Sequence, residues 1–550
     1  MPARTICIAI CLLAIRGTAA QVCSPVVKAF PSAEGYGANA IGGRSPLGTV
    51  IEVTTCADGN PPPTGSLRAA IEAAGPRFVV FRTGGTITLT RSLIITNPFI
   101  TIAGQTAPGG GIALKNDGSI TFPLLQVATH DVIIRYIRTR PGPDNSPNGS
   151  CCLDALSLNG NVSPSQPVFN VVVDHVSASW SVDELMEIFG DVHDVTVQWS
   201  IFSEGLFCSN HQKSIVPGGS GECPTGGPSH SRGITISALP EAQASPTNMT
   251  LHHNLIAHAD IRYPNFTTAG LLDFSNNVLY DYRTRLAKIA EKRTGMGLVV
   301  EVDFVGNFAD PGPESPATTQ HMIEVDNSND PNFDASIYSQ DNVANPPALA
   351  SLRPADAAYE VFSPHTLAPI VLSTAAQAKA DVLSDAGATL PVRDAVDTRI
   401  VGDVLDGNRG MFIDDPSEVG GWPVLDAGTP PVDSDHDGMP DAWETDHGLN
   451  PASSADAMAT APNGYANLEN YVNELAGDII PIIGDVNNDG QISLLDLPRF
   501  VTALIDPSMC QADLSVCDFP KADVNGDGFV DGGDIEGFVT LLLGCASAIP

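Results

Sequence analysis

The feature that most constrains the fold is a series of short β-rich strings between about residues 80 and 310. Gly, Asn, Asp and Pro break these strings, and almost no apolar pattern of helix length lies between them. The strings include FITIAG, VIIRYI, NVVVDHVSAS, DVTVQWSIFS, MTLHHNLIAH, LLDFSNNVLY and VVEVDFVGNF. Aligning them places five residues at equivalent positions, separated by 24, 54, 23 and 30 residues: Val176, Ser200, Asn254, Asn277 and Asn307.

A repeat of low-twenties length with three strands predicts an all-β parallel β-helix, in which each coil stacks on the one before. We expect Asn254, Asn277 and Asn307 to form a ladder at one bend. The 54-residue step is expected to hold two coils, enlarged by a Gly/Pro-rich excursion. An antiparallel sandwich is the alternative, but the coil-like period and the scarcity of Asn-Gly hairpin turns favour the β-helix.

Charge is concentrated at one end of this 550-residue chain, whose net charge is -36. From Pro431 onward there are 21 acidic side chains and only two basic ones, Arg499 and Lys521, which leaves 19 net negative charges there. Such acidity argues against nucleic acid as a partner, because phosphate binding needs clustered Lys and Arg. It suits a divalent cation instead.

The start of the chain is typical of a secretion signal, assigned to residues 1–20: Arg4, an apolar run, then small residues. The run is too short for a membrane span, and no later segment reaches about 18 apolar residues. We expect a secreted, extracellular monomer that is not held in a membrane. Export makes disulfides plausible: Cys208 is expected to pair with Cys223, and the adjacent Cys151 and Cys152 are expected to take different partners.

Five strings together resemble a secreted pectate lyase of the polysaccharide lyase family 1 type. They are AFPSAEGYGANAIGGR (29–44), GSLRAAIEAAGPRFVVF (65–81), TIAGQTAPGGGIAL (101–114), DHVSASWSVDE (174–184) and HHNLIAHADIRYP (252–264). Residues 387–404 also resemble the tail that follows such domains. The resemblance implies a right-handed parallel β-helix over residues 21–425 and calcium-assisted β-elimination of a polyuronate, with pectate as the expected substrate.

This chemistry removes the proton at C5 of a uronate, next to a carboxylate that is already negative. A cation on that carboxylate lowers the barrier as a Lewis acid and a countercharge. The resemblance matches Asp154, Asp183 and Glu187 to the calcium-binding carboxylates, with Glu184 as a substitute. From their spacing alone they could equally be solvated surface acids.

By the same resemblance, Arg262 matches the arginine that takes the C5 proton. Arginine is effectively always protonated, so either nearby cations disfavour its charged form or it stabilises the developing enediolate electrostatically. A surface salt bridge is the alternative role. The chain also departs from the family at Asn265, where many relatives carry a second basic residue. Five basic residues are candidates to replace it, of which the first two are our substrate-binding candidates: Lys213, Arg232, Arg283, Arg285 and Lys288.

The string DSDHDGMPDAWE places acids at positions 1, 3, 5, 9 and 12 of a loop with Gly438 at position 6, a spacing that wraps oxygen ligands around Ca²⁺. It resembles thrombospondin type 3-like calcium linkers, and we assign residues 426–478 to such a linker; a plain acidic linker is the alternative. The predicted ligands are Asp433, Asp435, Asp437, Asp441 and Glu444.

Two further loops, 485–496 and 523–534, share one ligand pattern, and an apolar helical pattern follows each. Residues 479–550 therefore resemble a small α-helical type I dockerin module, which needs calcium to fold and whose implied partner is a cohesin. Leu494–Leu495 and Gly532–Gly533 depart from the usual polar pairs, so a calcium-stabilised tail without a partner is the alternative. The predicted ligands are Asp485, Asn487, Asp489, Ser493, Asp496, Asp523, Asn525, Asp527, Asp531 and Asp534.

Two other functions fit a β-helix. A glycoside hydrolase would use paired acids such as Asp183 and Glu187 without calcium. A non-catalytic carbohydrate-binding surface protein would need no Arg262. Ultraviolet absorbance of an unsaturated product separates the lyase from both.

Overall fold

The computed structural model describes most of the chain, and the predicted signal peptide lies outside the described residues. These are 27–45, 48–161, 166–217, 221–238, 245–267, 270–283, 286–290, 299–316, 321–327, 333–345, 350–461, 463–478, 484–486, 492, 494–506, 519–525 and 529–542. They form two compact units: a large one of residues 27–461 and 465–479, and a small one that includes residues 480–550.

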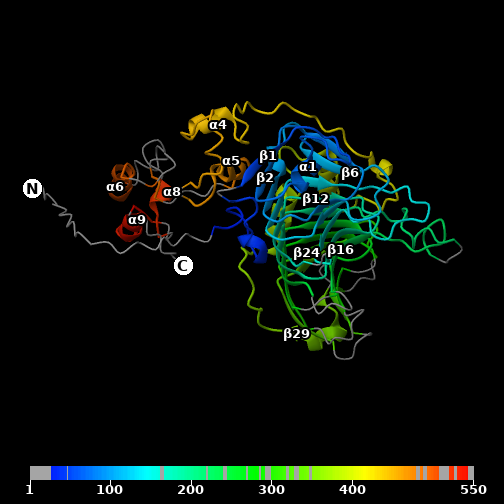
Figure 1. Cartoon of the computed structure of the whole chain (residues 1–550). Helices are drawn as coiled ribbons and strands as arrows, with labels where there is room; N and C mark the ends of the chain where they lie inside the picture. Colours follow the sequence, from blue (N-terminus) through cyan, green and yellow to red (C-terminus); the bar gives the residue numbers. More distant parts are fainter. Residues whose placement is uncertain are drawn as a thin grey trace, which may run out of the picture. The chain divides into compact units, whose positions relative to one another are not determined.

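The large unit is a coil of three sheets whose strands pair in parallel (Figure 1). Sheet I contains β3 (Gly85–Leu89), β6 (Ile112–Asn116), β9 (Ile137–Thr139), β12 (Ser177–Ser179), β15 (Ile201–Ser203), β18 (Leu255–Ala259), β21 (Val278–Tyr282), β24 (Phe308–Asp310) and β27 (Val343–Ala344). Sheet II contains β4 (Leu93–Ile95), β7 (Leu125–Val127), β10 (Leu156–Asn159), β13 (Glu184–Phe189), β16 (Arg232–Ser237), β19 (Asn265–Thr267), β22 (Ala287–Ala290), β25 (His321–Asp326) and β28 (Ala350–Leu352).

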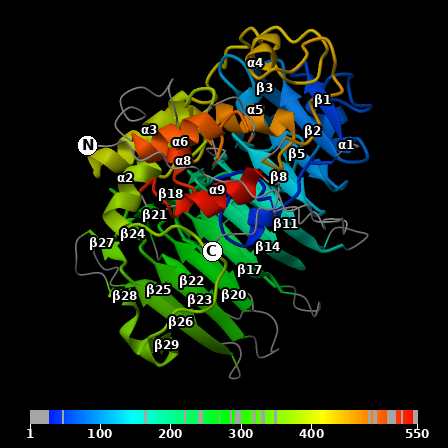
Figure 2. The same cartoon turned by 90° about the vertical axis from the view of Figure 1, so that its left-hand side faces the viewer.

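Sheet III contains β1 (Thr49–Val53), β2 (Arg77–Phe81), β5 (Ile100–Ala103), β8 (Val132–Arg135), β11 (Val168–Asp174), β14 (Val192–Gln198), β17 (Thr247–His252), β20 (Gly270–Ser275), β23 (Val299–Val305), β26 (Asp334–Gln340) and β29 (Glu360–Val361). Figure 2 shows its strands from β11 to β29 lying side by side. From β3 onward the chain passes through sheets I, II and III in turn, then starts the next coil. This confirms the predicted parallel β-helix; its right-handed sense stays a prediction from the family resemblance.

Aliphatic side chains fill the inside of the coil in stacked rows. One row in sheet III pairs its members in register from coil to coil, and all of them are buried. Each fully buried side chain of this kind contributes roughly 1.5–3 kcal/mol to stability. The row consists of Ile100, Val132, Val171, Val195, Met249, Leu272 and Val302.

The predicted asparagine ladder occupies the corner between sheets III and I. The Asn254 amide nitrogen donates to Asn277 Oδ1 at 3.0 Å, and the Asn277 amide nitrogen donates to Asn307 Oδ1 at 2.9 Å. The ladder continues to Asn342, a rung that the sequence did not predict. At the start of this corner most coils place a residue with positive φ, such as His253 at 52°.

The expectation that the 54-residue step holds two coils is wrong. Ile201 of β15 pairs directly with Leu255 of β18, and the Ser200 amide nitrogen donates to Asn254 Oδ1 at 2.9 Å. The step is therefore one coil, and its extra length is one long excursion, residues 204–231, between β15 and β16.

Helices add to the outside of the coil. Helices α2 (Ala375–Asp385) and α3 (Ala395–Asp406) bury Val382 and Ile400 against sheet I residues such as Leu255. The remaining helices of the large unit are α1 (Leu67–Glu72), α4 (Asp441–Asp446), α5 (Asn467–Leu475) and the short 3-10 helices η1 (Tyr36–Asn39), η2 (Gly104–Thr106), η3 (Pro354–Tyr359) and η4 (Pro416–Val419).

The acidic segment that contains α4 and α5 packs on the β-helix and belongs to the same unit. Met439, Leu468 and Val472 share one buried cluster with Phe78 and Val80 of β2. Residues 433–478 are therefore fixed to the coil by an apolar contact.

The small unit contains α6 (Leu497–Ile505), α8 (Phe519–Ala522) and α9 (Asp534–Leu542). Phe500 of α6 stacks on Phe538 of α9 with ring centroids 3.8 Å apart, at the centre of a small buried cluster. No helix in the described part of the chain is long and apolar enough to cross a membrane.

Candidate active site

The corner between sheets I and II carries the predicted catalytic residues. Asp154 precedes β10, Asp183 precedes β13, Arg232 begins β16, and Arg262 lies between β18 and β19. These are four successive coils. Because neighbouring strands in a sheet lie about 4.8 Å apart, residues that are distant in sequence meet at this corner.

Three acids form a compact cluster here: ligand atoms of Asp154, Asp183 and Glu184 lie within 4.8 Å of one another. Asp154 is 2% exposed, and its Oδ1 accepts a hydrogen bond from the Glu184 amide nitrogen at 3.0 Å. Burial, with the charges of Glu187 and Asp183, raises the pKa of Asp154 well above its usual range. An all-oxygen cluster of this kind has the donors that Ca²⁺ prefers.

Glu187, the third predicted ligand, lies in the middle of β13 and is not a member of this set. Its Oε2 accepts a hydrogen bond from Ser157 of β10 at 3.4 Å. Glu184, which we named as a substitute ligand, is the third member of the set with Asp154 and Asp183.

Two buried histidines flank Asp183, and the sequence analysis did not identify either. His230 Nε2 lies 2.8 Å from Asp183 Oδ1, and the ring of His230 stacks on that of His211 with centroids 3.5 Å apart. Burial is the largest factor that lowers the pKa of His230, so its imidazole is neutral near pH 7 and Nε2–H donates to Asp183. Burial alone would raise the pKa of Asp183, but the His230 hydrogen bond and the charge of Arg262 lower it on balance.

Arg262 contacts the edge of the acid cluster. Its backbone has a positive φ of 76°. Its Nη1 donates to Thr235 Oγ1 at 2.8 Å and forms an ion pair with Glu184 Oε1. Its carbonyl oxygen accepts from the Ile234 amide nitrogen at 2.8 Å, and only glycine fits at position 233, because a Cβ there would lie 2.3 Å from the Arg262 oxygen.

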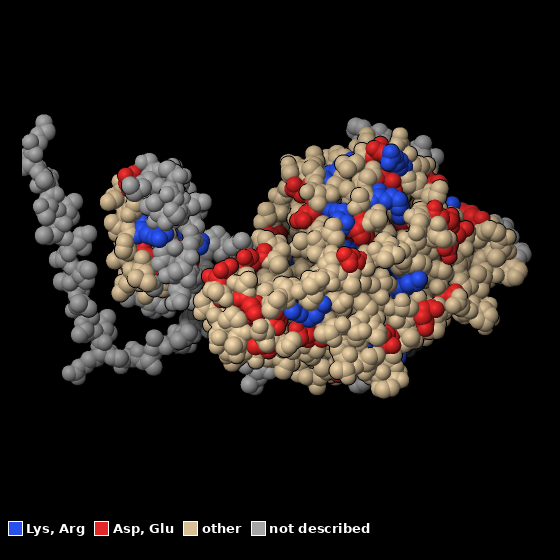
Figure 3. Space-filling model, turned by 90° about the horizontal axis from the view of Figure 1, so that it is seen from above, with Lys and Arg blue, Asp and Glu red and all other residues tan. Residues whose placement is uncertain are grey.

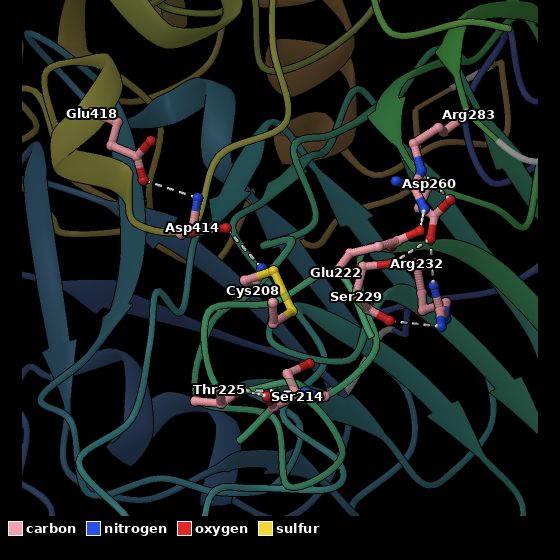
Figure 4. Close-up of a disulfide and its surroundings, with 12 residues drawn as sticks. Cys208, Ser214, Glu222, Thr225, Ser229, Arg232, Asp260, Arg283, Asp414 and Glu418 are labelled. Carbon is pink, nitrogen blue, oxygen red and sulfur yellow. Dashed lines mark hydrogen bonds and ion pairs between the residues drawn. A yellow bond between two sulfur atoms is a disulfide. The ribbon is translucent and has the colours of Figure 1, made fainter. Parts of the chain in front are cut away.

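The two predicted substrate-binding residues lie on or beside the 204–231 excursion. Lys213 is exposed, and its amide nitrogen donates to His211 Nδ1 at 3.1 Å. Arg232 is held by Asp260 Oδ2 at 3.3 Å, and Arg283 contacts the same carboxylate (Figure 4).

Disulfides shape the loops of this corner. Cys208 pairs with Cys223 as predicted, closing the excursion (Figure 4). The expectation for Cys151 and Cys152 is wrong, because they bond to each other. This bonded pair leads into Leu153, whose carbonyl oxygen accepts from the Asp183 amide nitrogen at 3.2 Å.

Asn265, which stands where many relatives carry a basic residue, has a basic neighbour on the next coil. Asn265 of β19 pairs in register with Lys288 of β22, which pairs with Asp326 by an ion pair. The separation of 23 residues equals that between Asn254 and Asn277, so the repeat could have placed Lys288. The sequence offered no such signal for His211 and His230, since they lie in the excursion and outside the repeat. Of the other candidate bases, Arg285 lies outside the described residues.

The acidic residues of the linker form potential ligand sets of their own, which share no residue with the catalytic cluster. Asp433, Asp435 and Asp437 form one set of potential ligands, and Asp437, Glu444 and Asp456 form another. Burial is the largest of the effects that raise the pKa of Asp437 and the pKa of Glu444, each to about 7. Asp441 belongs to neither set, and its carboxylate accepts hydrogen bonds from the Ser434 amide nitrogen and hydroxyl, both at 2.7 Å.

In the small unit, Asp485, Asp496 and Asp534 are buried. Asp534 accepts hydrogen bonds from amide nitrogens of its own loop, those of Val524 and Asp531 among them. The predicted ligands Asp523, Asn525 and Asp531 are also described, whereas four others lie outside the described residues: Asn487, Asp489, Ser493 and Asp527.

Comparison with known proteins gives close relatives but no matching family model. The chain is 32% identical over 479 residues to a probable pectate lyase C of Aspergillus flavus, covering 84% of this chain and 96% of the relative. It is 33% identical over 462 residues to a probable pectate lyase C of Aspergillus fumigatus, covering 81% and 93%.

Solved structures of lower similarity include the cedar pollen allergen jun a 1, with a TM-score of 0.43 and 17% identity over 64% of this chain and 92% of that one. Another is a pectate lyase from Bacillus sp. N165 in complex with trigalacturonate, with a TM-score of 0.39 and 16% identity over 64% and 98%. The sequence relatives decide the assignment: with about a third of its residues identical over more than four-fifths of its length, the chain belongs to the pectate lyase family of polysaccharide lyases.

Proposed function

We propose that this protein cleaves polygalacturonate by calcium-dependent β-elimination and releases 4,5-unsaturated oligouronides. One observation carries the proposal: the cluster of Asp154, Asp183 and Glu184 lies beside Arg262, so a cation site and a guanidinium border the same space. Figure 3 shows one face of the molecule, on which basic and acidic side chains lie among mostly uncharged ones.

Asp154, Asp183 and either Glu184 or Glu187 would hold the calcium ion. Asp154 fits this role because it is buried among carboxylates that raise its pKa, a cost that a bound cation removes. Bound Ca²⁺ would neutralise the uronate carboxylate and so make the C5 proton more acidic.

Arg262 is the catalytic residue in this proposal and acts at the C5 proton. In the described state its guanidinium is engaged by Glu184. If Glu184 turns to a cation, that ion pair weakens and the guanidinium can face the substrate. There its charge stabilises the enediolate that develops as the C5 proton leaves.

Lys213 and Arg232 are proposed to bind carboxylates of neighbouring sugar units. Lys213 is exposed on the excursion, and Arg232 is fixed by Asp260 one coil before Arg262. Lys288 supplies a basic group next to Asn265 and would serve the subsite that the Asn265 departure leaves without charge.

The test is the ultraviolet absorbance of unsaturated product from polygalacturonate, measured in calcium and in chelator. Arg262→Ala should reduce turnover about 10²–10⁴-fold with an unchanged circular dichroism spectrum. Arg409→Ala is the matched control, because Arg409 is an exposed arginine paired with Asp406. New reducing ends without absorbance would establish a hydrolase, and binding without either signal would establish a carbohydrate-binding protein; both contradict the proposal.

For residues 479–550 we propose a calcium-stabilised docking module of dockerin type, with a cohesin as partner. The observation that favours it is that large apolar side chains are exposed near both α6 and α9. Leu494 and Leu495, before α6, are 75% and 70% exposed, and Phe529, before α9, is 70% exposed. Binding of the full chain to immobilised cohesins, with and without calcium, tests this. Leu494→Asp should abolish the binding, and calcium-independent binding or none at all contradicts the proposal.

We also propose that the protein is exported as a monomer through the signal in residues 1–20. Fungal relatives of the pectate lyase family and the two disulfides support this compartment. Recovery of the mature chain from culture medium, followed by light scattering, tests both points.

A further inference from the structure

A second acid cluster lies in the segment that packs on the outside of the β-helix. Ligand atoms of Asp437, Glu444 and Asp456 lie within 4.8 Å of one another, and Asp437 is also within that distance of Asp433 and Asp435. The spacing rule for a calcium loop predicts four of these five. It does not predict Asp456, which lies 12 residues after the loop's final ligand, Glu444.

The buried oxygens of this cluster lack partners. Glu444 is 0% exposed, and neither Oε1 nor Oε2 has a hydrogen-bond partner among the described residues. Oδ2 of Asp437, a residue that is 1% exposed, and Oδ1 of Asp456 are in the same situation. A buried carboxylate without a partner costs several kcal/mol, and native structures rarely leave such groups unsatisfied.

We propose that a calcium ion binds at this cluster and that Asp456 is one of its ligands, in place of Asp441. Five carboxylates supply the oxygen atoms of a hard cation, and the two sets contain no His or Cys that would favour a transition metal. Asp441 is left out because it belongs to neither set of neighbouring oxygens, and its carboxylate accepts hydrogen bonds from the Ser434 amide nitrogen and hydroxyl instead. The ion therefore joins two segments, the loop 433–444 and the turn that contains Asp456.

The loop is also attached to the β-helix, which gives the ion a structural role. Asp433 Oδ2 lies 3.5 Å from Arg82 Nη1, and His436 Nδ1 lies 3.0 Å from Glu52 Oε2 of β1. At Gly438, whose φ is 91°, a Cβ would already lie 3.0 Å from Val50. The ion would thus help the apolar contact of Met439 to hold residues 433–456 on the outer face of β1 and β2. Its loss should loosen the loop and the turn, while the catalytic corner between sheets I and II is unaffected.

Terbium(III) tests the site, because it occupies calcium sites and is excited by a nearby tryptophan. Trp443 lies in α4 next to Glu444 and serves as the antenna. The full-length protein should give a luminescence titration, and the part of the signal that Trp443→Phe removes should report this cluster, because terbium at the catalytic cluster has its own tryptophan in Trp180, three residues before Asp183. Asp456→Asn should weaken terbium binding about tenfold or more, since charge count sets affinity. Asp441→Asn is the matched control, because Asp441 lies inside the loop but belongs to neither ligand set. Its affinity for terbium should stay within about twofold of that of the wild type.

The same variants separate a lost ligand from a lost fold. In chelator, Asp456→Asn and the wild type should unfold at nearly the same temperature, and a given concentration of calcium should raise the unfolding temperature of the wild type by more than that of the variant. Pectate cleavage in saturating calcium should be equal in both. The proposal is overturned if Asp441→Asn weakens terbium binding as much as Asp456→Asn does, if neither does, or if Trp443→Phe keeps the full signal.

Discussion

The hydrogen bond from His230 to Asp183 is the contact through which the excursion acts on the proposed calcium cluster. The two atoms lie 2.8 Å apart, and the side chains are only 4% and 14% exposed. The neutral imidazole donates from Nε2, since the pKa of His230 is lowered by burial first. Removing this donor leaves Asp183 less well oriented toward a cation.

The magnitude follows from the kind of bond. A hydrogen bond to a charged group contributes roughly 1.5–3 kcal/mol, which corresponds to about 10–100-fold in affinity at about 1.4 kcal/mol per factor of ten. Loss of a group that orients a metal ligand falls in the same range. We therefore expect His230→Ala to raise the calcium concentration that gives half-maximal activity by about 10–100-fold.

The assay is the initial rate of product absorbance at increasing calcium. His230→Gln should recover most of the loss, because a glutamine amide can donate from a position near Nε2. His193→Gln is the control: His193 makes an equivalent 2.8 Å contact with Asp194 on sheet III. An unchanged calcium requirement in His230→Ala, in a protein that melts like the wild type, would refute the reasoning.

Three further predictions concern stability. Asn277→Ala should lower the free energy of unfolding by about 2–6 kcal/mol in denaturant titrations, since it leaves two buried Asn254 donors unpaired at about 1–3 kcal/mol each; a change under about 1 kcal/mol would contradict the ladder's role. Cys208→Ser/Cys223→Ser should cost about 3 kcal/mol, because this bridge closes a loop with a separation of 15 residues, whereas Cys151→Ser/Cys152→Ser should cost far less because adjacent residues close no loop; equal thermal shifts would count against this. Burial lowers the pKa of His258, but Asp281 and Asp403 outweigh it and raise it to about 9, so stability present below about pH 6.5 should be lost as pH rises through about 9, and His258→Gln should flatten that slope in thermal unfolding.

The repeat made the fold predictable, whereas the candidate site was predicted from the family motifs. Asn254 and Asn277 could be aligned because each rung must meet an identical environment one coil on, and the same constraint fixes which strand follows which. Asp154, Asp183 and Arg262 followed from family motifs at one corner. The roles of these three residues were predicted from the family resemblance, because the repeat alone gives no reason to distinguish them from other residues at the corner.

What could not be predicted depends on contacts outside the repeat. His230 meets Asp183 through the fold of a 28-residue excursion, and no periodicity constrains that path. Asp456 meets Glu444 because a second turn folds back on the loop, whereas spacing rules assume that a loop supplies all of its own ligands. Cys151 and Cys152 were misassigned because adjacency was taken to prevent a bond that the backbone of this turn allows.

Two of the three corners in the coil have different tolerances for change. Between sheets III and I, the turn from β17 to β18 has two residues, and so has the turn from β20 to β21. Between sheets I and II, the connection ranges from three residues before β4 to 28 before β16. Exchanging residues 204–231 for the loop of another coil should therefore alter which substrates the candidate site at this corner accepts, while Ile201 still pairs with Leu255. One residue added to the short turn would instead shift every rung beyond it, which makes the excursion corner the place where new specificities can be grafted.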